Sequence, residues 1–451
     1  MAGDDRTPSE QTRLERRFER ALTPFQEFVG DQTTSSLLLI LCTAAALVLA
    51  NSPYAHDYRA IVETPLGVHF GTHRLSMDLR HWINDGLMSL FFFLIGLEIK
   101  RELLVGELRD LQRSLPVILA ALGGMLMPAL IYASLNAGGD FVHGWGIPMA
   151  TDTAFVVGVL ALLGRRVPPA VVTFLTALAI LDDLGAILVI AAFYSESLSL
   201  PHLAVAAGLL ALLAQANLLG IRTPGLYLLG GVLIWAAMLG SGVHTTVAGI
   251  LVAATVPARP KRQPAWFLRR TRSLIGRFQE IEARKAGAQP MLGEAEQHEV
   301  VQRVQEAAEK ATTPLRRWES ALDRPVSLLV MPVFALANAG IAVDMQSLRE
   351  LWHNPLTLGV VAGLVFGKSI GIPLFTWLAL ALRLGRLPQG VGMRHIVGIG
   401  LLGGIGFTMS IFIAGLGFSD APEAMFAAKA GILAASLIAG SAGYLWLRLR
   451  S

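Results

Sequence analysis

Long runs of apolar residues alternate with short polar stretches from Thr34 to Leu447. An α-helix rises about 1.5 Å per residue, so about 20 apolar residues cross the ~30 Å hydrocarbon core of a bilayer. The pattern predicts an all-α, polytopic membrane protein with about twelve transmembrane helices. The predicted spans are residues 34–51, 81–104, 115–135, 145–163, 170–194, 203–218, 225–239, 243–256, 325–343, 355–382, 396–416 and 425–447.

The polar stretches divide the chain into four predicted parts. These are an N-terminal tail (1–33), spans one to eight (34–257), a long charged loop (258–324), and spans nine to twelve with a short C-terminus (325–451).

Several polar segments have patterns of their own. Residues 11–28 fit either a short amphipathic helix or a solvated tail, and residues 62–78 alternate around turn residues, which predicts a small hairpin. In the long loop, residues 265–278 mix apolar side chains with arginines, as in a helix on a membrane surface. Residues 280–310 have a helix-forming composition without a core, so we expect a partly disordered insertion.

The fifth span contains only two charged residues, Asp182 and Asp183, near its middle. A charge at the centre of a membrane costs roughly 2.5–3.5 kcal/mol, and no basic residue within this span offsets either carboxylate. The structural alternative is a pair that faces a polar gap between helices. We interpret the pair as a site for a cation and a proton.

The tenth span also holds one charge near its middle, Lys368. The tripeptide from Gly367 to Ser369 resembles part of a phosphate-binding loop, but the position of the required first glycine is occupied by Ala362. We therefore reject that motif. Adjacent residues on a helix point about 100° apart, so one aspartate of the pair is expected to face an ion path while the other meets Lys368.

Two spans are predicted to be broken. The fourth is interrupted by Pro148 and by Thr151 and Asp152, which can cap a restarted helix. The eleventh is rich in glycine from Gly398 to Gly406. Because spans 3–5 and 10–12 begin on opposite sides of the membrane, we predict an inverted repeat in which helices 4 and 11 cross at the ion site. Asp152 is expected to offset the positive helix ends at the breaks, and Lys368 the negative ones.

The basic residues predict the orientation. Of the 37 Lys and Arg residues, 31 lie in the two termini, in every second loop or, for Lys100 and Arg101, at the span end beside such a loop. The alternate loops hold only Arg59, Arg74, Arg80 and Arg349. By the positive-inside rule, both termini are cytoplasmic.

Composition agrees with a membrane protein, since 53% of the residues are apolar and only 16% are charged. The net charge of +4 does not indicate nucleic-acid binding, because the basic residues lie in loops between spans. A single cysteine, Cys42, excludes an intrachain disulfide.

Three further residues are candidates for pH sensing. Glu98 and Glu102 share one face near the basic end of the second span. They belong either to a solvated helix end or to a vestibule that attracts cations. His244, between spans seven and eight, is either a pH sensor or a polar helix terminus.

The motifs resemble the bacterial NhaA sodium/proton antiporter family. The matching segments are Trp82–Asp85, Gly96–Glu98, Ala150–Phe155, Ala177–Ala186, Ser241–His244, Phe366–Gly371 and Gly404–Ser410. Together they lie in spans two, four, five, ten and eleven and around the connection between spans seven and eight. The inverted repeat is itself a known feature of this family, so its agreement with the motifs is not independent support.

The resemblance implies electrogenic exchange of sodium or lithium for protons, with Asp183 as the main cation ligand and Asp182 as the partner of Lys368. It implies that Thr151 and Asp152 lie where helices 4 and 11 cross. It also implies pH control from a cytoplasmic funnel to which Glu98, Glu319 and Glu102 belong. Two departures, the long insertion within 257–324 and Ser320 and Asp323 where histidines are often found, leave the pH set-point open.

The sequence thus predicts an electrogenic, pH-regulated sodium or lithium/proton antiporter of the bacterial inner membrane that uses alternating access. It is a secondary transporter rather than an enzyme, without a cofactor and without a nucleic-acid partner. Its expected partners are membrane lipid, the transported ions and a second copy of the chain, joined through the hairpin 62–78. The alternative is a sodium-coupled solute symporter with a related inverted-repeat fold.

Overall fold

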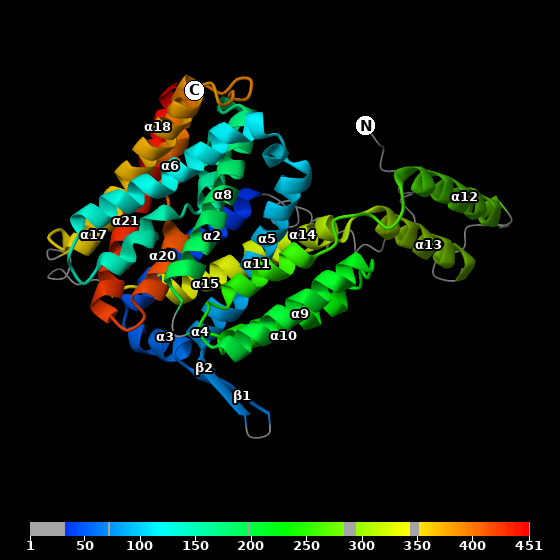
Figure 1. The fold of residues 1–451 in the computed structure, drawn as a ribbon, viewed down its shortest axis with the longest axis horizontal. Helices are drawn as coiled ribbons and strands as arrows, with labels where there is room; N and C mark the ends of the chain where they lie inside the picture. Colours follow the sequence, from blue (N-terminus) through cyan, green and yellow to red (C-terminus); the bar gives the residue numbers. More distant parts are fainter. Residues whose placement is uncertain (1–31, 71–72, 196–197, 284–294, 343–350, 451) are drawn as a thin grey trace, which may run out of the picture. The chain divides into compact units, whose positions relative to one another are not determined.

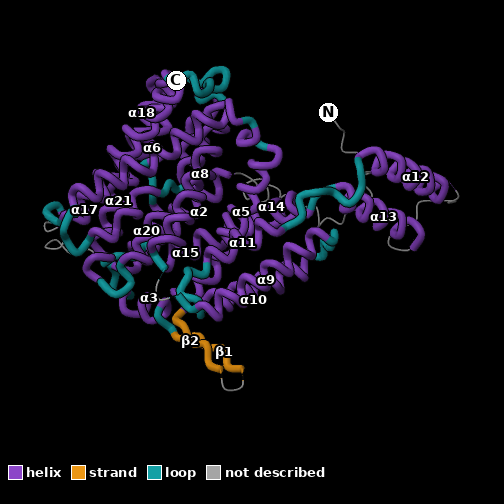
Figure 2. Tube along the Cα trace, viewed as in Figure 1, coloured by secondary structure: helices purple, strands orange, loops and turns teal. Residues whose placement is uncertain are grey.

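The computed structural model describes residues 32–70, 73–195, 198–283, 295–342 and 351–450. The predicted helix or tail at 11–28 lies outside these residues. Within them the chain is almost entirely helical, as Figure 2 shows, and β1 (Pro65–Phe70) and β2 (His73–Asp78) form the only described sheet. The strands pair antiparallel, from Pro65 opposite Asp78 to Phe70 opposite His73, which confirms the predicted hairpin.

Eight described helices are long and apolar enough to cross a membrane, or ten if each of two bent helix pairs counts as one span. Two shorter apolar helices, α10 (Pro224–Leu239) and α11 (Thr246–Thr255), lie where the seventh and eighth spans are predicted. The chain is therefore a multi-pass membrane protein, and the count of twelve stays a prediction.

The chain forms two compact units, each assembled from separate segments. The first unit comprises residues 1–80, 115–182 and 327–451. Its described helices are α2 (Gln32–Ala50), α3 (Ala55–Val62), α6 (Leu111–Leu135), α7 (Thr153–Leu163), the first half of α8 (Pro169–Phe193), α15 (Met331–Asn338), α17 (Pro355–Ala362), α18 (Lys368–Ala381), α19 (Met393–Gly403), α20 (Phe407–Gly417) and α21 (Pro422–Arg450) (Figure 1).

Glycine permits very close helix packing in the first unit. A Cβ at Gly123 of α6 would lie 2.3 Å from the carbonyl oxygen of Gly371 in α18, and one at Gly371 would lie 2.1 Å from that of Gly123. Helices in membranes associate largely through such small-residue contacts. This crossing fixes α18, which carries Lys368 at its start.

The second unit comprises residues 81–114 and 183–326. A short helix, α4 (Leu79–His81), precedes its π-helical turn at Trp82–Leu87. Its further helices are α5 (Met88–Val105), the second half of α8, α9 (Leu200–Leu218), α10, α11, α12 (Pro264–Ala283), α13 (Ala295–Ala311) and α14 (Pro314–Pro325). Gly249 of α11 meets α5 closely, since a Cβ there would lie 2.3 Å from the carbonyl oxygen of Ser89.

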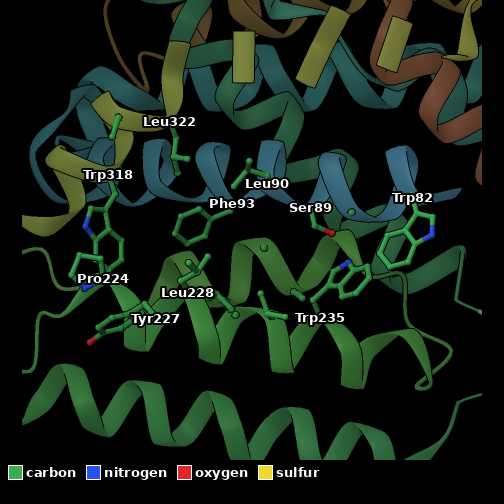
Figure 3. Close-up of a pocket in the computed structure, with 17 residues that line it drawn as sticks. Trp82, Ser89, Leu90, Phe93, Pro224, Tyr227, Leu228, Trp235, Trp318 and Leu322 are labelled. Atoms are coloured by element: carbon green, nitrogen blue, oxygen red, sulfur yellow. The ribbon is translucent and has the colours of Figure 1, made fainter. Parts of the chain in front are cut away.

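A cavity of about 520 Å³ in the second unit is lined by residues of the π-helical turn Trp82–Leu87 and of α5, α10, α11 and α14 (Figure 3). Its wall is apolar and includes Trp82, Phe93, Tyr227, Trp235 and Trp318. The rings of Trp82 and Trp235 stack with centroids 5.9 Å apart. Because sodium prefers oxygen ligands, this cavity does not suit an ion.

Two details of the long loop differ from the sequence-based expectation. Residues 280–310 were expected to lack a core, but this is wrong for α13, which packs on α12 through a small seam of Leu274, Ile281 and Val300. The helix that carries the ninth predicted span begins at Pro314 rather than Pro325, because the Thr313 side chain accepts a hydrogen bond from the Arg316 N–H and caps it.

Candidate functional site

The fourth span is broken at the predicted place. A 3-10 helix (Val142–Met149) ends before the non-helical residues 150–152, of which Ala150 and Asp152 are extended, and α7 begins at Thr153. Proline at 148 cannot supply a helical N–H, and Asp152 accepts a hydrogen bond from the Phe155 N–H at 3.1 Å. Asp152 is therefore the N-cap of the restarted helix.

The eleventh span is broken as well, and the same aspartate serves it. Helices α19 and α20 are bent by 46° at residues 404–406. Asp152 Oδ2 accepts from the N–H of Thr408 at 3.0 Å and from its hydroxyl, while the Asp152 N–H donates to the Ile405 carbonyl at 2.7 Å. One buried carboxylate thus caps the N-termini of both α7 and α20.

Thr151 connects this junction to α8. Its Oγ1 lies 2.8 Å from Asp182 Oδ2 and 3.0 Å from the carbonyl oxygen of Gly403, the last residue of α19. A hydroxyl has one proton, and an ionised carboxylate is a stronger acceptor than a carbonyl, so Thr151 donates to Asp182 when that carboxyl is ionised. Thr151 is only 1% exposed, so its hydroxyl is shielded from bulk solvent.

Lys368 and Asp182 form a fully buried ion pair. Lys368 Nζ lies 2.6 Å from Asp182 Oδ2, and both side chains have 0% exposure. The predicted meeting of one aspartate with Lys368 therefore holds in the structure, and that aspartate is Asp182. Among the residues that the structure describes, Asp182 Oδ1 accepts no hydrogen bond.

Asp183 follows Asp182 on α8 and is 5% exposed. The two carboxylates point about 100° apart around the helix, so both cannot bind Lys368 in the same way. The structure thus distinguishes a lysine-bound aspartate from a second buried one. No group of three or more His, Cys, Asp or Glu side chains suited to a resident metal ion occurs in the described part of the chain.

The predicted funnel acids come together around an arginine. Arg101 pairs with Glu102 at 2.7 Å and with Glu319 of α14 at 2.8 Å. Glu98 interacts electrostatically with Glu319 and Arg101. Sequence reasoning selected the three glutamates and missed Arg101, although its place beside Glu102 at the basic end of α5 was a usable signal.

His244 is more than a polar helix end. Its Nε2 lies 3.3 Å from Asp85 Oδ1 and its Nδ1 lies 2.8 Å from the Thr246 hydroxyl. The indole N–H of Trp235 donates to the Asp85 carbonyl at 2.9 Å. Nothing in the spacing of His244 and Asp85 indicates this pair, because Asp85 lies in the π-helical turn before α5 and His244 in the distant connection before α11.

Comparisons with known proteins agree with the motifs. A family model described as Na⁺/H⁺ antiporter 1 matches residues 26–447. The Na⁺/H⁺ antiporter NhaA 1 of Saccharophagus degradans is 47% identical over 98% of this chain and 95% of its own. The Na⁺/H⁺ antiporter NhaA 1 of Shewanella denitrificans is 47% identical over 100% of this chain and 99% of its own.

A solved structure, the sodium proton antiporter MjNhaP1 of Methanocaldococcus jannaschii, covers 92% of both chains with a TM-score of 0.46 and 14% identity. The family match and the relatives together span nearly the whole chain. The chain therefore belongs to the Na⁺/H⁺ antiporter 1 family, as its motifs imply.

Proposed function

We propose that this protein is a secondary transporter that exchanges sodium or lithium for protons across the bacterial cytoplasmic membrane. The observation that carries the proposal is the buried Asp182 carboxylate, held by Lys368 and Thr151 beside the junction of two broken helices. Two aspartates in the middle of an apolar helix carry a large free-energy cost of burying charge, and a purely structural role does not explain that cost. Such a pair can, however, hold either a cation or a proton.

Asp183 is the main cation ligand in this mechanism. Sodium needs oxygen ligands and negative charge, and Asp183 supplies both from a buried position. Asp182 is already engaged with Lys368, which fixes its position and balances its charge. A proton neutralises the same charge that sodium needs, so the two ions compete for one site. The aspartates titrate as a coupled pair.

We assign the breaks in the fourth and eleventh spans a role in the alternating-access mechanism. Helix ends at a break carry partial charges in a low-dielectric region, and Asp152 neutralises two positive ends at once. We propose that spans 3–5 and 10–12 are inverted repeats within twelve spans, with both termini cytoplasmic. The four parts 1–33, 34–257, 258–324 and 325–451 then alternate between cytoplasmic and membrane segments.

Regulation by pH belongs to the second unit. Arg101 holds Glu102 and Glu319, and Glu98 lies within their field. Protonation of these acids would break the ion pairs of Arg101, including the pair with Glu319 that links α5 to α14. His244 and Asp85 form a second ion pair that depends on protonation. We assign pH regulation to these two groups.

We also propose a homodimer formed through residues 62–78. The β1–β2 hairpin is a two-stranded sheet, so each strand has one edge without a partner among the described strands. Such an edge can pair with the same hairpin of a second copy.

Proton flux in proteoliposomes tests the proposed function. Sodium or lithium added outside acidified vesicles is expected to drive proton efflux, with a dependence on membrane potential that marks electrogenic exchange. A sodium-coupled solute symporter, the alternative reading, would move no protons without its solute. Absence of proton movement with sodium, lithium and potassium across a pH series would exclude the antiporter.

The Thr151 hydroxyl is expected to set the sodium affinity. In Thr151→Val the shape is kept but the ionised Asp182 loses a donor, an interaction worth about 1.5–3 kcal/mol for a charged acceptor. The apparent sodium affinity should therefore fall by about tenfold or more. Thr151→Ser keeps the hydroxyl and is the matched control. Equal sodium affinities of the Val and Ser variants would show that the hydroxyl has no such role.

A further inference from the structure

The segment that leaves α11 is strongly basic. Residues 257–279 contain seven Lys and Arg residues and no Asp or Glu: Arg259, Lys261, Arg262, Arg269, Arg270, Arg272 and Arg277. None of the seven forms an ion pair with any residue that the structure describes. A basic stretch whose cations form no ion pair suits an anionic partner.

Helix α12 has a second apolar face that its neighbour does not cover. Leu274 and Ile281 point into the seam with α13. Leu268 and Ile275, seven residues apart and so on one face of the helix, are 66% and 51% exposed. Around the helix, Arg269 and Arg272 lie next to this outer face, on the same side of it. Arg270 instead lines a small polar cleft against α13. An exposed apolar stripe beside arginines is the pattern of a helix that lies in a membrane interface.

The partner helix α13 has the opposite charge. It carries four glutamates, and its two cations are already paired, Arg303 with Glu299 and Lys310 with Glu306. The helices run antiparallel, because residues near the end of α12 meet the start of α13, as in the hydrogen bond between Gln297 and Glu282 (Figure 1). A negative surface would therefore attract the α12 side of the hairpin and repel the α13 side.

Chain connectivity limits how far α12 is from the membrane. Lys100 Nζ donates to the carbonyls of Ala254 and Val256, which anchors the end of the apolar helix α11 to α5. Only residues 256–263 connect the end of α11 to the start of α12, and eight residues reach at most about 28 Å. The basic helix is thus tethered close to the end of an apolar helix.

We propose that α12 docks on the anionic surface of the membrane, with Leu268 and Ile275 in the lipid interface and Arg269 and Arg272 on the headgroups. The partner is a bilayer that contains anionic lipid. This contact is separate from the ion site and does not depend on the proposed transport function.

The test uses the full-length protein with Cys42 replaced by Ser and one new cysteine carrying an environment-sensitive fluorophore. Ile275→Cys reports the outer face, and Ser273→Cys, exposed on a different side of α12, is the matched control. The protein is reconstituted into vesicles of phosphatidylcholine alone or of equal parts phosphatidylcholine and phosphatidylglycerol. Only the label at 275 should shift to the blue, only in the anionic vesicles, and the shift should disappear in concentrated potassium chloride.

A further pair of substitutions, Arg269→Glu with Arg272→Glu, should abolish the shift at 275 while the protein still exchanges ions. The same emission from both labels, or a shift of equal size in phosphatidylcholine alone, would overturn the proposal. A blue shift in detergent that grows with protein concentration would also overturn it, because the face would then bind a second copy of the chain.

Discussion

Replacement of Asp183 by Asn is expected to abolish sodium-driven proton movement while the protein still folds and inserts. An amide has the shape of the carboxylate and can offer a carbonyl oxygen to sodium, but it can neither balance the charge of the cation nor release a proton. Proteoliposomes with the variant should show the same proton flux as vesicles without protein.

The matched control is Asp140→Asn, which removes a carboxylate from an exposed position between the third and fourth predicted spans. Its flux should equal that of the unchanged protein. Sodium-driven flux of normal size in Asp183→Asn would refute the assignment of Asp183 as the main cation ligand.

Replacement of Lys368 by Ala is expected to reduce both stability and transport. Removal of one partner of a buried ion pair leaves an uncompensated charge and costs about 3–5 kcal/mol. The variant should therefore melt at a lower temperature than the unchanged protein in the same detergent. Lys261→Ala, at an exposed lysine, is the control and should leave the melting temperature unchanged.

A double-mutant cycle separates the pair from other effects of the lysine. Asp182→Asn removes the charge that Lys368 compensates, so the double variant should lose less stability than the sum of the two single variants. Additive losses would mean that the 2.6 Å contact contributes no coupling between the two residues.

Much of the architecture follows from the sequence because the bilayer imposes a simple rule. Every backbone polar group inside it needs an internal partner, so long apolar runs become helices. Proline at 148 and the glycines before Thr408 marked the two breaks, since both residue types weaken a helix. A buried lysine and two buried aspartates had to be compensated, so the meeting of Lys368 with one of the two was predictable on that ground. The choice of Asp182 rested on the family resemblance, and the structure pairs Lys368 with Asp182.

Other contacts depend on how distant helices approach each other, which spacing does not encode. The binding of Asp152 to both α7 and Thr408 is one example, and the pair His244–Asp85 is another. In these cases the sequence marked one partner as unusual but could not select the other. The polar partner is an ordinary residue until the fold brings it close.

Two misreadings had local signals. Thr313 followed by Pro314 is typical of a helix N-cap and first residue, and it marked the true start of the helix that continues into the ninth predicted span. In α13, Val300, Val304 and Ala307 recur at helical spacing, but the stripe is narrow and surrounded by charges. Its partner stripe on α12 makes the seam stable, and neither stripe alone predicts a core.

The proposed competition between sodium and protons for one site has a kinetic consequence. The apparent sodium affinity should weaken steadily as the pH falls, while the maximal rate changes far less. In each alternating-access cycle, the site then carries across the membrane whichever ion is bound. The sodium and proton fluxes are therefore coupled without a second binding site. Separate sites for the two ions would instead let both bind together, and sodium affinity would not follow pH.

Calorimetry of sodium binding to the detergent-solubilised protein tests this shared site most directly. In the absence of a membrane gradient, sodium should expel protons from the aspartate pair, and the buffer should take them up. The observed heat is therefore expected to change linearly with the ionisation enthalpy of the buffer at a pH where the pair holds a proton. A heat that is the same in all buffers at that pH would mean that no proton is released, and it would contradict the shared-site mechanism.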